Sequence, residues 1–313
     1  MRLQFQFLET VNGLDNSNSQ IITRIRGQLD KATTAPGMVM ISLSAVALGA
    51  AFGGYLPLIS LWMETFNISF QRIGIVCGAS AVGVVSSAYF APKLAARYGY
   101  ILTINVGLVV AAIMTVAFRF TDNYGLWLAL RFVSGLGLGL HWVLTEAWLA
   151  NIVTEKYRTR VMAIYATAIS IGFAIGPMVI WLFGALSIIP FIIMGALLIL
   201  AALPILRLKG HEPKDSQTRS ASPLILIKKA PTVASACIVV GSVDLALISL
   251  LPAMITRTPE AAPILALIIV PAMAIGATIL QYPIAIIADK HGLRKVGVIT
   301  VCAGLIFASL IPF

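Results

Sequence analysis

From Met38 onward, the chain is a nearly continuous succession of apolar runs, each of about 20 residues. A helix of this length rises roughly 30 Å, which matches the hydrocarbon core of a bilayer. Only 11% of the 313 residues are charged, against roughly 25% in an ordinary soluble domain. The runs lack strict apolar and polar alternation and are about twice as long as a barrel strand. They predict an all-α, polytopic membrane protein and exclude a soluble globular domain.

Charged and polar interruptions divide the apolar region into nine predicted helices. Six precede and three follow the one long internal loop, which is rich in charge, Ser and Pro. The predicted domains are a polar cytoplasmic tail (1–37), a six-helix bundle (38–206), a cytoplasmic linker (207–230) and a partial second bundle of three helices (231–313). The predicted spans are 38–63, 73–92, 100–118, 124–150, 161–185, 187–206, 231–255, 262–288 and 296–313.

The net charge of +10 comes from 22 Lys and Arg against 12 Asp and Glu. Most of these cations fall in loops that share one side of the membrane if the amino terminus is inside. Cytoplasmic loops carry such an excess. The positive charge therefore predicts a multi-pass membrane protein with a cytoplasmic amino terminus, and no nucleic-acid partner is expected.

Two loops after even-numbered spans form a weak internal repeat, because both place a basic residue two positions before a glycine. The glycines are Gly99 in the first half and Gly292 in the second. The second loop resembles the cytoplasmic gate loop of the major facilitator superfamily, G-x-x-x-D-(R/K)-x-G-x-(R/K)-(R/K), although Ala285 occupies its first glycine position. In the first copy, Pro92 replaces this glycine and Ala96 replaces the acid. The matching residues of the second loop are Asp289, Lys290, Gly292, Arg294 and Lys295.

Two further motifs strengthen this resemblance, which extends from Met38 to the last residue. The fourth span, from Arg131 through Gly135 to Gly139, is similar to the R-x-x-x-G-x-G motif of the family. The fifth span, with Gly172, Gly176 and Pro177, resembles the GxxxGP motif of antiporters and exporters. Independently of the family, small residues at this spacing let helices approach closely, and the proline adds a bend.

The resemblance implies a secondary transporter that moves a small organic solute by alternating access between two bundles. The expected partners are the solute, protons and membrane lipid, with export slightly favoured over uptake. The segment around Glu146 and Trp148 is similar to a bacterial branch of drug and sugar permeases, and the resemblance implies a location in the bacterial inner (cytoplasmic) membrane.

Four ionisable residues lie inside predicted spans, where charges are costly and usually face the protein interior or a watery cavity. They are Arg131, His141 and Glu146 in the fourth span, and Asp244 about halfway through the seventh. On a helix that turns about 100° per residue, Arg131, Gly135, Trp142 and Glu146 share one face. We predict that Arg131, Trp142, Glu146 and Asp244 line a path for substrate or protons.

Each of these charges has a second interpretation. Arg131 either holds an anionic group or tunes the pKa of a nearby acid, or it is an outer-leaflet side chain that reaches the interface. Glu146 is either a cavity acid or a structural partner of the cytoplasmic Arg158 or Arg160.

Asp244 has no Lys or Arg nearby on its own span. It is either a reversible proton site or a neutral buried acid that is hydrogen-bonded. His141 points about 80° away from Arg131, which favours a packing role over a proton relay.

No enzyme is predicted, since the sequence contains no HExxH, Walker or GxSxG motif and no Cys and His cluster. No cofactor or metal is expected. A second half that matched the first would need six helices, and three are predicted. The alternative function is therefore a truncated or non-transporting membrane scaffold or sensor with this fold, in which self-association could supply the missing wall of the cavity.

Overall fold

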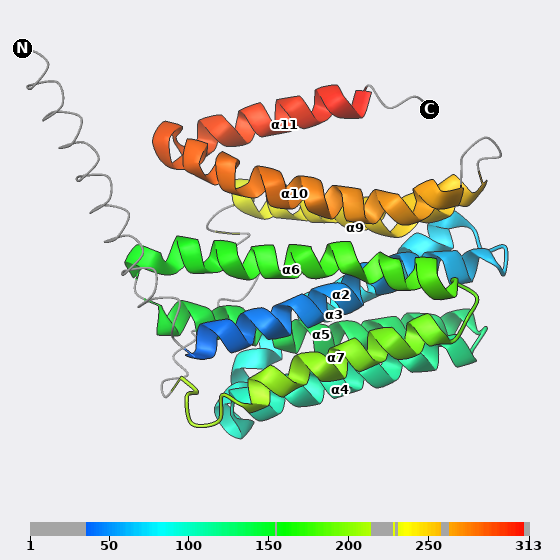
Figure 1. Cartoon of the computed structure of the whole chain (residues 1–313), viewed down its shortest axis with the longest axis horizontal. Coiled ribbons are helices and arrows are strands. Elements are labelled where there is room, and N and C mark those ends of the chain that lie inside the picture. The colour runs from blue at the N-terminus through cyan, green and yellow to red at the C-terminus, as the bar shows by residue number, and fades with distance from the viewer. Residues whose placement is uncertain (1–35, 154, 214–227, 229–230, 258–262, 310–313) are drawn as a thin grey trace, which may run out of the picture.

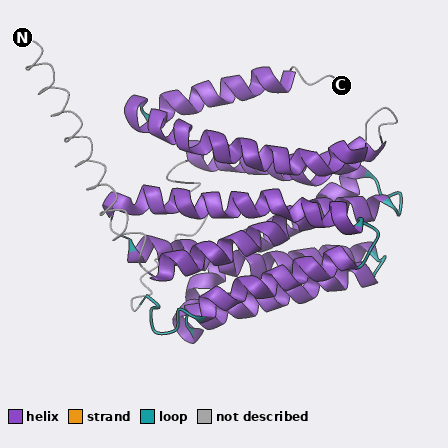
Figure 2. Ribbon diagram, viewed as in Figure 1, coloured by secondary structure: helices purple, strands orange, loops and turns teal. Residues whose placement is uncertain are grey.

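The computed structural model describes residues 36–153, 155–213, 228, 231–257 and 263–309, and its regular structure is entirely helical (Figure 1; Figure 2). This confirms the predicted all-α fold, with nine α-helices in the described part of the chain. Most of the predicted amino-terminal tail and most of the predicted linker lie outside the described residues. The helices are α2 (Pro36–Glu64), α3 (Phe70–Tyr98), α4 (Tyr100–Ala117), α5 (Tyr124–Ile152), α6 (Glu155–Phe183), α7 (Ile189–Leu206), α9 (Pro231–Arg257), α10 (Pro263–His291) and α11 (Leu293–Ser309).

Seven of these helices are long and apolar enough to cross a membrane, namely α2 to α7 and α9. In α10 and α11, the apolar stretches found among the described residues are shorter, at Ile268–Leu280 and Lys295–Gly304. The seven candidate spans agree with the predicted ones and make this a multi-pass membrane protein.

Several helices continue beyond the predicted apolar spans. Helix α3 runs on to Tyr98 through a segment that was predicted to be a loop, and α10 runs on to His291. Apolarity marks only the part of a helix inside hydrocarbon, whereas Lys and Arg are good helix formers in water. The turns themselves are single glycines, Gly99 with φ 84° and Gly292 with φ 88°. A positive φ is readily adopted only by glycine, so the two halves of the internal repeat share this turn.

Helices α2 to α7 pack into one bundle with two apolar clusters, one toward each end. Helix α2 packs against α6 and α7, and α5 packs against α3 and α4. One cluster contains Trp148 and Ile205, and the other contains Trp127 and Phe191.

The last three helices form a separate layer on the side of α6 and α2 that faces away from α4 and α7 (Figure 1). Helix α9 contacts α2 and α3, α10 contacts α6 and α9, and α11 packs on α10. A third apolar cluster joins the layer to the bundle through Leu56, Ile248 and Val270.

Helix α9 meets the bundle along its carboxyl-terminal half. Ile248, Ser249 and Ala253 are buried, and Leu250 lies beside Gly74 of α3. In contrast, every residue from 237 to 244 is exposed. Because eight consecutive residues cover all faces of a helix, the bundle leaves this stretch of α9 uncovered.

Candidate functional site

A cavity of about 540 Å³ lies between the bundle and the last helices, at the level where α9 leaves the bundle. Its walls come from α5, α6, α9 and α10, so both halves of the chain contribute to it. The lining residues are Trp142, Ile169, Ser170, Phe173, Asp244, Ile248, Val270, Met273, Ala274, Gly276 and Ala277. Most of these side chains are apolar or small.

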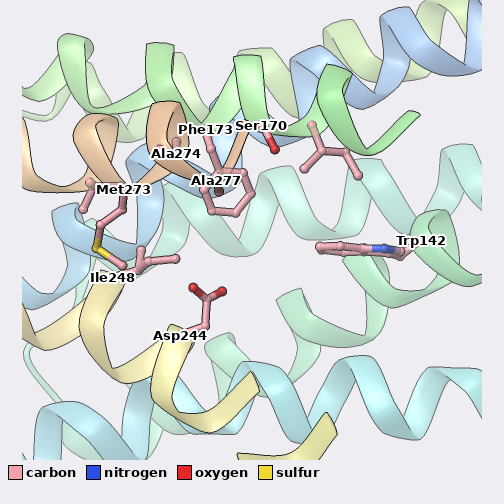
Figure 3. Close-up of a pocket in the computed structure, with 11 residues that line it drawn as sticks. Trp142, Ser170, Phe173, Asp244, Ile248, Met273, Ala274 and Ala277 are labelled. Carbon is pink, nitrogen blue, oxygen red and sulfur yellow. The ribbon is translucent and has the colours of Figure 1, made fainter. Parts of the chain in front are cut away.

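Asp244 supplies the one carboxylate among the described lining residues. Its side chain points from α9 into the cavity, while Trp142 of α5 and Phe173 of α6 lie on other walls (Figure 3). The structure thus brings together two of the four residues of the predicted path, Trp142 and Asp244, although they belong to different halves of the sequence.

Trp142 and Phe173 form an aromatic wall of the cavity, and Phe52 of α2 packs against both rings without lining the cavity itself. The Phe52 ring packs edge-on against Trp142, with ring centroids 6.1 Å apart, and against Phe173 at 5.5 Å. Edge-to-face contacts at these distances are favourable. They hold the two lining rings in fixed positions on neighbouring helices.

Glu146 lies next to this wall and is linked to it through Trp142. The indole Nε1 of Trp142 donates a hydrogen bond to Oε1 of Glu146 at 2.8 Å, one turn along α5. The neighbouring Thr145 hydroxyl is 3.0 Å from the Tyr165 hydroxyl of α6. The side chains of Arg158 and Arg160, the alternative partners of Glu146, lie outside the described residues.

Arg131 is placed deep in the bundle, away from the lining of the cavity. Its side chain has no solvent-exposed surface, and its guanidinium carbon lies 4.9 Å from the centroid of the Tyr55 ring on α2. The three guanidinium nitrogens have no hydrogen-bond partner among the described residues. This burial disagrees with the interpretation of Arg131 as a side chain that reaches the membrane interface.

His141 packs inside the bundle on the opposite side of α5 from Glu146. Its Nε2 is 2.8 Å from the Ser44 hydroxyl, which in turn donates to the Ala201 carbonyl at 2.7 Å. Since a hydroxyl has one proton to donate, Nε2 of His141 is the donor to Ser44. The network ties α2, α5 and α7 together, which agrees with a packing role.

The predicted packing glycines lie at helix crossings. A Cβ at Gly135 would overlap the carbonyl oxygen of Ser80 on α3 and would lie 2.8 Å from the Ser80 Cα, closer than real Cβ atoms approach. Gly172 and Gly176 face the backbone of α2 in the same way, and Pro177 is buried beside them in α6. These positions allow close approach of α5 to α3 and of α6 to α2.

The predicted gate loop is described only in part. The side chains of Asp289, Lys290 and Arg294 lie outside the described residues, Gly292 forms the turn, and Lys295 is exposed. The equivalent turn of the first half, at Gly99, has no acid of its own in the motif. Instead, Oε2 of Glu212 accepts a hydrogen bond from the adjacent Tyr100 amide at 3.0 Å. No sequence signal pointed to Glu212, which follows α7 and lies far along the chain from α3.

Comparison with known proteins agrees with this architecture. The family model of the Major Facilitator Superfamily matches residues 41–313. An uncharacterised MFS-type transporter of Bacillus subtilis (strain 168) is 26% identical over 273 residues, which are 85% of this chain and 68% of the relative. Another, from Yersinia pestis (strain Pestoides F), is 24% identical over 220 residues, 69% of this chain and 55% of the relative. The chain thus spans between about half and two thirds of these relatives.

Solved structures share the fold. A bacterial homologue of the human lysosomal transporter Spinster, inward-facing and unoccupied, gives a TM-score of 0.65 at 17% identity over 82% of this chain and 63% of that one. A D-xylose–proton symporter gives a TM-score of 0.55 at 19% identity over 80% of this chain and 69% of that one. The family model covers most of the chain, and the helical fold is the same. This chain belongs to the major facilitator superfamily.

Proposed function

We propose that this chain moves a small organic solute across the bacterial cytoplasmic membrane, coupled to protons and with export favoured over uptake. The observation that carries the proposal is the cavity between the two helix groups, with the Asp244 carboxylate in its wall. Superfamily membership makes a transporter the natural function for such a cavity. Substrate sites of secondary transporters lie near the midplane, between the repeated halves.

Alternating access is supported by the way the two groups of helices meet. They contact each other around Ile248 and Val270, and they are apart beside residues 237–244 of α9. With the amino terminus in the cytoplasm, as the distribution of Lys and Arg predicts, this open side faces the cytoplasm. Rocking of the bundles about the contact around Ile248 would close it and open the opposite side.

Asp244 is the proposed proton site because it lies in a membrane-spanning helix and reaches the cavity. A carboxylate at this depth can be neutralised by a proton or by a bound partner. We assign Trp142 and Glu146 to the solute path through their hydrogen bond. Arg131 is assigned an indirect role in transport. Its contact with Tyr55 holds α5, which carries Trp142 and Glu146, against α2.

The test is transport by the purified chain in proteoliposomes with an imposed pH gradient and an entrapped pH dye. Uptake or release of labelled benzyltrimethylammonium, benzylsulfonate and D-xylose is followed together with proton movement. We expect one class of solute to move with protons, and Asp244→Asn to abolish proton-driven movement. Asp122→Asn, which changes an exposed acid before α5, is the matched control and should leave transport unchanged.

Two results would overturn the proposal. If no solute of any class moves, the chain is better described as a non-transporting membrane protein of this family. If Asp244→Asn leaves proton-driven movement intact, the assignment of the proton site is wrong.

A further inference from the structure

We propose that the cavity takes a monovalent organic cation with apolar substituents, and that the Asp244 carboxylate is its counter-ion. This inference rests on the proposed function, because it names the class of solute that the same cavity admits. Three properties of the cavity carry it: the sign of its charge, its aromatic wall and its shortage of hydrogen-bonding groups.

The charge of the cavity has one sign. Asp244 is ionisable, and none of the other described lining residues is. Arg131, the one cation predicted to line the solute path, is fully buried against Tyr55 and does not line the cavity. A cleft with low-dielectric walls that is lined by one sign of charge focuses the field of that charge. A bound cation would therefore be attracted by Asp244, and a bound anion would be repelled with no described cation to offset the repulsion.

The aromatic wall favours the same sign. Trp142 and Phe173 line the cavity, and each makes a T-shaped contact with Phe52. The faces of aromatic rings carry negative potential and attract cations, tryptophan most strongly, and quaternary ammonium groups are recognised by such rings. In Figure 3 these rings and the Asp244 carboxylate border the same space, so one cation can contact both.

The remaining surface suits apolar substituents better than hydroxyl groups. Ile169, Ile248, Val270 and Met273 contribute only apolar atoms or a thioether. A sugar would find few hydrogen-bonding partners for its hydroxyls in this wall, whereas an apolar substituent would bury its surface against it. The wall offers few polar groups for hydrogen bonds to such hydroxyls, since the Trp142 Nε1 already donates to Glu146.

Helix α10 presents small residues to the cavity. Ala274, Gly276 and Ala277 lie on the wall where larger side chains would fill the space. A Cβ added at Gly276 would meet no atom within 4 Å. The resulting volume of about 540 Å³ is in the range of small-molecule sites, roughly 300–1,000 Å³.

The experiment uses two ions of nearly equal shape and opposite charge, tetraphenylphosphonium and tetraphenylborate. Each is titrated by equilibrium dialysis into the full chain in lipid nanodiscs, with empty nanodiscs to subtract partition into lipid. We expect saturable binding of the cation, at least tenfold weaker binding of the anion, and no binding of D-xylose. Asp244→Asn should weaken cation binding at least tenfold, whereas Asp244→Glu and the control Asp122→Asn should retain it.

A second variant tests the aromatic wall. Trp142→Leu should weaken cation binding several-fold, while Trp142→Phe, which keeps a ring, should retain most of it. Equal or tighter binding of tetraphenylborate would overturn the inference, and so would unchanged cation binding in Asp244→Asn.

The proposed function and this inference can be refuted independently of each other. Cation binding without transport refutes the proposed function alone, and proton-coupled movement of D-xylose or benzylsulfonate with no cation movement refutes this inference alone.

Discussion

Gly172 lies where α6 crosses α2, and Gly172→Ala tests how tightly that crossing is packed. An added Cβ would overlap the Val46 carbonyl oxygen and would lie 2.5 Å from the Ala50 amide nitrogen. All of the close atoms belong to the α2 backbone, which cannot rotate away as a side chain can. To restore ordinary contact, α6 must move away from α2 by roughly 1 Å. Overpacking of this kind costs about 1–3 kcal/mol.

The assay is unfolding of the full chain by SDS in mixed micelles, followed by tryptophan fluorescence. The matched control is Gly241→Ala on α9, where an added Cβ meets nothing within 4 Å. It should be at least as stable as the parent, because alanine is the better helix former. If Gly172→Ala unfolds with the same free energy as Gly241→Ala, the crossing is not tightly packed and the reasoning fails. Because Phe173 follows Gly172 and contacts Phe52 at 5.5 Å, the displacement should also weaken solute binding in the cavity.

Three other changes have definite expected outcomes. Ser44→Ala should lower the free energy of unfolding by about 1–3 kcal/mol in the same SDS titration, because the buried Nε2–H of His141 loses its acceptor. Glu212→Ala should lower it by about 0.5–1 kcal/mol, since the amide at the start of α4 loses a charged acceptor. Arg131→Lys should insert normally but lose proteoliposome transport, because a compact ammonium does not replace a planar guanidinium over the Tyr55 ring.

The Ser44 prediction has a matched control variant, and each of the three has an outcome that would contradict it. Ser86→Ala removes a hydroxyl that donates only within its own helix, to the Val82 carbonyl, and should leave stability nearly unchanged. A Ser44→Ala variant as stable as Ser86→Ala would show that the His141 network contributes nothing. For Glu212, unchanged stability would mean that the hydrogen bond to Tyr100 is not formed in the membrane. For Arg131, full transport by the lysine variant would exclude a role that depends on the guanidinium.

Much of the fold followed from the apolar pattern. The nine predicted helices agree with the described ones, and the glycine turn at Gly99 was expected from the repeat with Gly292. What the pattern missed was helix length. Helix α3 extends to Tyr98 because its charged last turns are stable in water, although they are not apolar.

The orientation of individual helices was harder to predict. The helical-wheel argument put Arg131 and Trp142 on one face of α5, and both do contact α2, through Tyr55 and Phe52 respectively. They lie at different depths, however, and only Trp142 reaches the cavity. Spacing along one helix defines a face, but which part of that face borders open space depends on the neighbouring helices.

The residues that shape the cavity beyond its polar groups could not be predicted at all. Phe173, Ile248 and Met273 look like any other apolar residue of a membrane span. In a soluble protein the buried face of a helix is more apolar than the exposed one. In a bilayer, lipid and protein neighbours are equally apolar, so composition does not separate a cavity wall from a lipid-facing surface.

The sequence by itself determined that this chain is a helical membrane protein, because hydrocarbon thickness and backbone hydrogen bonding leave few other solutions for such apolar runs. Its loop and glycine motifs indicated the major facilitator superfamily by resemblance, and the family model over residues 41–313 confirms it. It also marked Asp244 and Trp142, since a charge and an indole stand out in an apolar helix. Only the tertiary structure decided that these two residues border one cavity and that Arg131 is buried apart from it. The reason is physical: helix rotation and depth are set by close packing at small residues such as Gly172, and that packing depends on contacts between segments far apart in the chain.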